Sequence, residues 1–139
     1  MMSLNQQLIT VFKLCLALTL AGVIGYEREK YSKPAGLRTH MILSIGCTIL
    51  TVLSFDAFPL PTDNSRIAAA IITGIGFIGA GTVLQTRERI VGLTTAASIW
   101  LTASISLAVG TGNYVIAIAG TLLGYLVLES KPFQFKKGE

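Results

Sequence analysis

Charge is scarce in this chain of 139 residues. Asp, Glu, Lys and Arg together make up 13% of it, about half the share of roughly 25% that is usual in soluble domains. Histidine occurs once, and the two cysteines, Cys15 and Cys47, form no CxxC pair, so neither a disulfide framework nor a zinc motif is indicated. The mean hydropathy of +0.67 excludes disorder, which requires low hydrophobicity. An ordinary water-soluble enzyme is excluded as well, because 18 charged residues cannot cover its surface.

Long uncharged runs are present instead. Five apolar segments cover residues 8–26, 37–55, 66–84, 93–109 and 114–128, and turn-forming residues at 56–65 and 110–113 separate two of the pairs. A hydrocarbon core of roughly 30 Å needs about 20 residues of helix, and lipid offers the backbone no hydrogen-bond partner, so each segment must be helical. The sequence therefore predicts an all-α, polytopic bundle of about five transmembrane helices. We expect the first helix to be retained, because no basic region precedes it as in a signal peptide.

Basic residues alternate between the connections. One set of segments, the N-terminus and the second and fourth connections, holds only Arg66. The other set, the first and third connections and the C-terminal end, holds nine basic residues: Arg28, Lys30, Lys33, Arg38, Arg87, Arg89, Lys131, Lys136 and Lys137. Since cytoplasmic loops carry the excess of Lys and Arg, we expect the N-terminus outside and the C-terminus in the cytoplasm. Residues 1–130 would form the membrane domain and residues 131–139 a basic cytoplasmic tail. The dispersed net charge of +4 suits a bilayer of anionic lipid and indicates no nucleic-acid partner.

Small residues at four-residue spacing favour close helix packing in lipid. Gly120 and Gly124 form a GxxxG pair in the fifth segment, and packing within the chain or in a homo-oligomer would both explain them. The third segment has four glycines in eight residues, Gly74, Gly76, Gly79 and Gly81. They predict either tight packing or a locally broken helix that lines a cavity, as in many transporters.

With this topology, several polar residues fall at the cytoplasmic face. Two helix N-termini point there as well, and these favour anions. The residues that could converge there are Glu27, Arg28, Arg38, Thr39, His40, Thr94 and Thr95. They could shape a site for a ligand or a partner, or they could be interfacial charges that anchor the helices.

Three strings carry a specific resemblance: GYEREKYSKPAGLRTHMILSIGC, RIAAAIITGIGFIGAG and VGLTTAASIWLTASISLAVGTGNY. In this order they resemble the MgtC/SapB family of bacterial inner-membrane proteins, over about residues 8–128. The resemblance implies a multi-pass membrane domain associated with magnesium homeostasis and, in pathogens, with survival in macrophages. It also implies a regulator that binds the membrane ATP synthase. Many members carry a C-terminal domain similar to ACT domains, and we expect this chain to consist of the membrane domain only.

Metal binding and catalysis find little support in the residue types. A lone His40 cannot build a metal site. Its role is either that of a hydrogen-bonded residue at the membrane interface or that of a group that binds and releases protons. Asp56 and Asp63 could attract a hydrated Mg²⁺, or they could be loop residues, with Asp63 near a helix N-terminus. No cofactor is expected. Intramembrane hydrolysis needs a nucleophile with a base or a multi-ligand metal, so we do not expect an enzyme.

Two functions of different class remain. The first is a regulator that docks on a larger membrane-protein complex, with the ATP synthase as the partner that the resemblance implies. The alternative is a small transporter or channel for Mg²⁺ or another ion, with residues 74–81 lining the path. Such a path needs polar residues between the two faces, and Thr73, Ser98 and Thr102 are the obvious ones.

Overall fold

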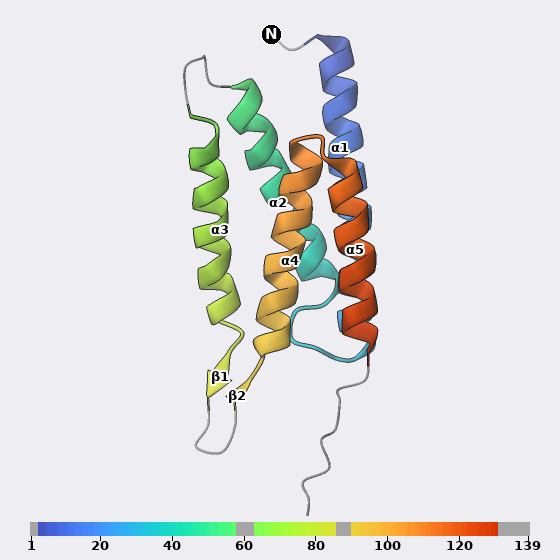
Figure 1. Ribbon diagram of the computed structural model, residues 1–139, viewed down its shortest axis with the longest axis vertical. Helices are drawn as coiled ribbons and strands as arrows, with labels where there is room; N and C mark the ends of the chain where they lie inside the picture. Colours follow the sequence, from blue (N-terminus) through green and yellow to red (C-terminus); the bar gives the residue numbers. More distant parts are fainter. Residues whose placement is uncertain (1–2, 58–62, 86–89, 131–139) are drawn as a thin grey trace, which may run out of the picture.

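The computed structural model describes residues 3–57, 63–85 and 90–130. It is an all-α bundle (Figure 1) whose five helices are α1 (Leu4–Lys30), α2 (Leu37–Asp56), α3 (Ser65–Ala80), α4 (Leu93–Gly110) and α5 (Tyr114–Glu129). The prediction of five helices is confirmed. Residues 131–139, the predicted basic tail, lie outside the described residues.

The third predicted segment was too long. It was expected to run to Leu84, but α3 ends at Ala80. Two short antiparallel strands follow, β1 (Leu84–Gln85) and β2 (Ile90–Val91), before α4 begins. At the end of α3 the hydrogen bonds tighten to i to i+3 contacts, because the Thr82 N–H and hydroxyl donate to the Gly79 carbonyl at 3.0 and 2.8 Å and the Val83 N–H donates to the Ala80 carbonyl at 3.1 Å. Gly92, the N-cap of α4, has φ +92°, a conformation that L residues with a side chain rarely adopt, and it lies against Thr82.

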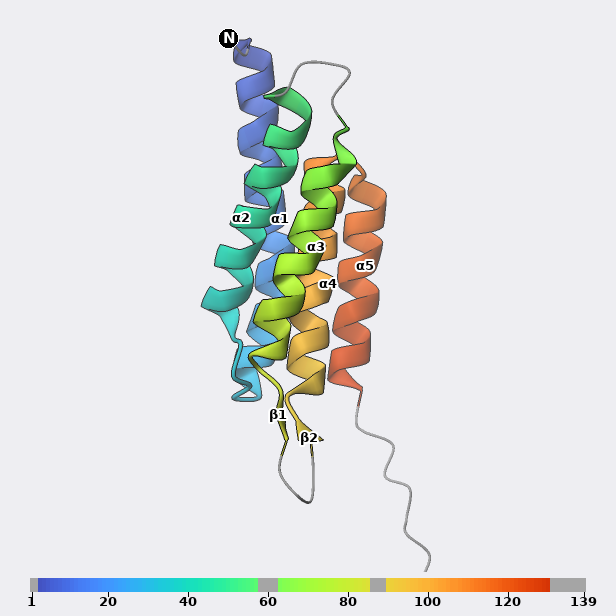
Figure 2. The same ribbon diagram turned by 90° about the vertical axis from the view of Figure 1, so that its left-hand side faces the viewer.

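The hairpin marks one end of the bundle, which we call the hairpin end. There α1, α3 and α5 finish and α2 and α4 begin (Figures 1 and 2). α1 starts at the opposite end with a capping box, in which Ser3 Oγ accepts from the Gln6 backbone N–H and Gln6 Oε1 accepts from the Ser3 N–H at 2.8 Å. Such a cap satisfies N–H groups that the first helical turn leaves unpaired, and it explains why α1 begins before Leu8.

α4 is the central helix. It contacts each of the other four helices, while α3 contacts α4 and, to a smaller extent, α2 (Figure 2). Three helices are apolar and long enough to cross a membrane, namely α1, α2 and α4. α3 and α5 are apolar but have 16 residues each, about 24 Å of helix.

The polarity of the bundle is inverted relative to that of a soluble domain. Large apolar side chains face outward, for example Phe77 and Val115, which are 84% and 82% exposed. Much of the buried interior is polar and comes from His, Ser and Thr of α2 and α4. This arrangement is what a hydrocarbon solvent favours, because apolar side chains can face lipid whereas polar ones need internal partners. The chain is therefore a membrane protein.

Candidate functional site

The connection from α1 to α2 is held tightly against the end of α1. Glu29 Oε2 accepts from the Leu37 backbone N–H at 2.7 Å, which satisfies a donor that the N-cap Gly36 leaves open. Gly25 on α1 permits the approach of α2, since a Cβ there would lie 2.8 Å from the Leu37 Cα. A carboxylate at a helix N-terminus is also favoured by the helix dipole. The acidic residue and the glycine therefore fix how α2 enters the bundle.

Glu27 and Arg28 form a buried ion pair at this hairpin end. The two residues are 1% and 3% exposed. Arg28 Nη2 donates to Glu27 Oε1 at 2.6 Å, and Arg28 Nε donates to the other carboxylate oxygen. This fork is the bidentate geometry that binds carboxylate and guanidinium most strongly. The charges of adjacent residues thus satisfy each other inside the bundle.

His40 lies one helical turn into α2 and is fully buried. Its Nδ1 lies 2.9 Å from the Gly36 carbonyl, so Nδ1 carries the proton and donates. Its Nε2 lies 3.2 Å from Ser98 Oγ on α4. Ser98 Oγ also lies 2.8 Å from the Thr95 carbonyl, and its single proton serves one of these two acceptors when the imidazole is neutral. His40 thus links α2 to α4.

Hydroxyl groups continue from His40 along the contact of α2 with α4 and α1. Ser106 Oγ lies 2.7 Å from Ser44 Oγ, and Ser44 donates to the Ala17 carbonyl on α1 at 3.0 Å. Thr102 donates to the Ser98 carbonyl at 3.0 Å. We call this set the polar seam: its buried members are His40, Ser44, Thr48, Thr51, Thr95, Ser98, Thr102 and Ser106.

Thr48 is the exception within the polar seam. Its hydroxyl is buried and has no hydrogen-bond partner among the described residues. Thr48 lies one turn after Ser44 on α2, and Lys13 lies one turn before Ala17 on α1. Because the two helices are antiparallel, both residues lie on the same side of the Ser44–Ala17 contact. Lys13 Nζ donates to the Gly110 carbonyl at 2.7 Å, at the C-terminal end of α4, where the helix dipole favours a cation. A charged group therefore lies near each end of the polar seam.

The sequence predicts part of this arrangement. Four of the seven predicted residues are buried at the hairpin end: Glu27, Arg28, His40 and Thr95. The other three are exposed and do not join this buried group: Arg38, Thr39 and Thr94. The α2 hydroxyls were missed. Their signal was spacing, because His40, Ser44 and Thr48 recur every four residues and so share a helix face.

The glycines divide into groups with different surroundings. Gly79 packs on Ala96 of α4, 3.6 Å from the position of an added Cβ, while nothing lies within 4 Å of such a Cβ at Gly74 or Gly76. α3 is unbroken from Ser65 to Ala80, and Gly81 follows at its C-cap. Tight packing thus explains Gly79 and leaves Gly74 and Gly76 without an internal contact.

The GxxxG pair of α5 faces the interior. A Cβ at Gly120 would lie 3.8 Å from Ile105 of α4, and one at Gly124 would collide with Leu101 of α4 and approach Ile24 of α1 to 3.5 Å. Both glycines therefore pack within the chain. A Cβ at Gly124 would require the Leu101 side chain to move, whereas one at Gly120 would make an ordinary van der Waals contact.

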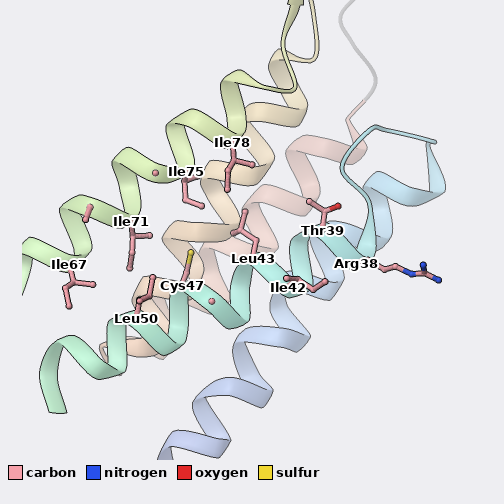
Figure 3. Close-up of a pocket in the computed structure, with 13 residues that line it drawn as sticks. Arg38, Thr39, Ile42, Leu43, Cys47, Leu50, Ile67, Ile71, Ile75 and Ile78 are labelled. Carbon is pink, nitrogen blue, oxygen red and sulfur yellow. The ribbon is translucent and has the colours of Figure 1, made fainter. Parts of the chain in front are cut away.

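A groove of about 770 Å³ opens between α2 and α3 (Figure 3). Its walls are apolar, with Leu43 and Cys47 on α2 opposite Ile71 and Ile75 on α3, and Arg38 lies at its hairpin end. Its volume falls in the range of about 300–1,000 Å³ typical of small-molecule pockets.

The acidic residues at the opposite end lie apart from this groove. Asp63 Oδ1 accepts from Ser65 Oγ at 2.6 Å and from the Ser65 N–H at 2.9 Å. These hydrogen bonds, from the side chain first and the backbone second, hold the pKa of Asp63 below its usual value. Asp56 is exposed at the end of α2. Within the described ranges, no three His, Cys, Asp or Glu residues come together as a metal site.

Comparison with known proteins gives relatives for nearly the whole chain. The profile of the MgtC family matches residues 14–135. The putative magnesium transporter YhiD of Escherichia coli K12 is 44% identical over 126 residues, which cover 86% of this chain and 59% of YhiD. Protein SapB of Bacillus subtilis is 38% identical (91% of this chain, 58% of SapB), and protein MgtC of Salmonella typhimurium LT2 is 35% identical (81% and 48%). The chain spans about half to three fifths of the length of these relatives. No solved structure matches it.

Proposed function

The chain belongs to the MgtC family, and on that premise we propose that it is an inner-membrane protein of magnesium homeostasis that regulates a larger membrane complex. Its relatives supply the link to magnesium, since one of them is named a putative magnesium transporter. The membrane ATP synthase is the candidate partner, because the family resemblance implies it. The protein would act by lateral association in the bilayer.

The closed polar seam is the observation that carries this proposal. Mg²⁺ takes six oxygen ligands in a near-ideal octahedron and gives up its water reluctantly. Along the seam, the carboxylate of Glu27 is committed to Arg28, and the hydroxyls of Ser44, Thr102 and Ser106 are committed to carbonyls or to each other. These groups hold α1, α2 and α4 together, and in this conformation a divalent ion would have to compete with their hydrogen bonds.

The orientation of the bundle is also part of the proposal. Arg28, Lys30, Lys33 and Arg38 lie at the hairpin end, so the positive-inside rule assigns this end to the cytoplasm. Ser3→Cys and Lys33→Cys, each made in a Cys15→Ser, Cys47→Ala background, would test it on intact cells with a membrane-impermeant maleimide. We expect labelling at position 3 only. Labelling at position 33 but not at position 3 would show that the orientation is opposite to the proposed one.

Ion transport is the second candidate. The name of YhiD favours it, and so does the extent of the polar seam, which reaches from His40 to Thr51 and includes the unpartnered Thr48 hydroxyl. For Mg²⁺ to pass, α2 would have to separate from α4 and break the Ser44–Ser106 contact. Transport would then depend on hydroxyls that regulation does not need.

One experiment separates the two candidates. The purified chain is reconstituted in sealed liposomes with a Mg²⁺-sensitive dye inside, and the variant Thr102→Val replaces a seam hydroxyl by a methyl of similar size. We expect no flux above that of protein-free liposomes, and we expect crosslinking in native membranes to join the chain to subunits of the ATP synthase. Flux that Thr102→Val abolishes would refute regulation as the sole function. Crosslinks to a different complex would replace the ATP synthase as the partner.

A further inference from the structure

The groove between α2 and α3 is occupied by nothing within the described chain, yet both of its walls are built for a long apolar ligand. We propose that it binds one acyl chain of an anionic phospholipid from the surrounding bilayer, with the phosphate of that lipid on Arg38. The inference is independent of whether the protein regulates a complex or transports an ion. It rests on the length of the groove, the charge at its end and the glycines in its walls.

The length of the groove matches one leaflet. On α2 the lining runs from Arg38 to Leu50 and on α3 from Ile78 back to Ile67, so at 1.5 Å per residue the groove is about 16–18 Å long. Half of a hydrocarbon core of roughly 30 Å is about 15 Å. An acyl chain of one leaflet would therefore end about where the groove ends.

The charge lies where a headgroup would. Arg38 is exposed at the hairpin end of the groove and makes no hydrogen bond or ion pair with any residue in the described ranges. Figure 3 shows its guanidinium directed beyond the end of α2, away from the isoleucines of α3, with Thr39 beside it. A free guanidinium can bind a phosphate bidentately. Lys33, close by in the sequence, adds positive charge to this end, whereas Lys30 is paired with Glu129.

Two glycines keep the groove open. Gly46 on α2 and Gly74 on α3 both line it, and a Cβ at either position would meet nothing within 4 Å. Glycine inside a helix costs about 1 kcal/mol relative to alanine, and at these two positions no close contact with a described residue explains it. An acyl chain lying between the helices would account for the missing side chains. Gly76 has equally open surroundings but does not line the groove, which makes it a matched control.

Native mass spectrometry of the full chain in mild detergent tests the proposal. Phosphatidylglycerol and phosphatidylcholine with identical acyl chains are titrated onto the wild type and onto Gly46→Leu/Gly74→Leu, Gly76→Leu and Arg38→Gln. We expect one tightly bound phosphatidylglycerol, held on the order of fivefold more tightly than phosphatidylcholine, as one basic residue near the headgroup provides. The double variant should lose this lipid, and Gly76→Leu should retain it. Arg38→Gln should prefer phosphatidylglycerol over phosphatidylcholine less strongly than the wild type does, and as an exposed substitution it leaves the core intact.

Three results would overturn the proposal. The first is equal affinity of the wild type for the two lipids. The second is equal loss of lipid in the double variant and in Gly76→Leu, because a general loss of structure would then explain both. The third is retention of the lipid by the double variant together with a shift from dimer to monomer in the same spectra, because the groove would then hold a second copy of the chain.

Discussion

The buried pair of Glu27 and Arg28 permits a quantitative prediction. Glu27→Gln keeps the shape of the side chain but removes its charge, and it leaves Arg28, which is 3% exposed, without a counter-charge. Breaking a buried ion pair by neutralising one partner typically costs about 3–5 kcal/mol, because the remaining charge stays desolvated. We expect a loss of this size in the free energy of unfolding. Replacing both residues, as in Glu27→Gln/Arg28→Met, should cost less than the two single substitutions together.

The assay is unfolding of the purified protein in mild detergent by increasing SDS, followed by circular dichroism. The Lys30–Glu129 pair is the matched control. Its Nζ–Oε1 distance is 3.2 Å and its side chains are 47% and 36% exposed, so water and salt screen it. Lys30→Ala should leave the unfolding midpoint unchanged. If Glu27→Gln behaved like Lys30→Ala, or if the single and double substitutions were additive, the pair would not be the desolvated contact that its burial indicates.

Two further predictions concern packing and hydrogen bonding, and the same unfolding assay measures them. Gly25→Ala should destabilise the protein by about 1–3 kcal/mol, because the added Cβ meets the α2 backbone. Gly76→Ala should be neutral or stabilise the protein by up to about 1 kcal/mol. If both substitutions changed the free energy of unfolding in the same direction, the close approach of α1 to α2 would be contradicted. Ser106→Ala removes a 2.7 Å contact with Ser44 and should cost about 0.5–1.5 kcal/mol, whereas Thr48→Val removes an unpartnered buried hydroxyl and should not destabilise. A clear loss of stability in Thr48→Val would indicate a bound water or another partner at that hydroxyl.

The candidate site shows how far sequence patterns reach. The positions of Glu27, Arg28 and His40 at one end of the bundle followed from span boundaries, because a helix of known length and direction fixes the depth of each residue. Their pairing did not follow. Two adjacent charges at a span boundary are equally consistent with exposed anchors, and only the packing of α2 against Gly25 shows that both are buried.

The glycines and the third helix show most clearly what the sequence could not predict. Glycine content could not distinguish packing from a cavity, because both require the absence of a side chain. The structure assigns Gly79 to a contact with α4 and Gly74 to the wall of an open groove. Hydropathy likewise extended the third helix to Leu84, because lipid and a short apolar hairpin favour the same residues. The end of α3 at Ala80 depends instead on the hydrogen bonds that Thr82 and Val83 make to its last turn, which hydropathy does not contain.

The sequence alone determined the class of the protein, the number of its helices and most of their bounds. These properties depend on local quantities, the transfer of each segment into hydrocarbon and the turn-forming residues between segments. The tertiary structure decided which faces meet. It joined the hydroxyls of α2 and α4 into the polar seam, buried the Glu27–Arg28 pair and left a groove beside Arg38. Such contacts depend on the rotation and tilt of one helix against another, which a stripe of small or polar residues leaves open until its partner is known.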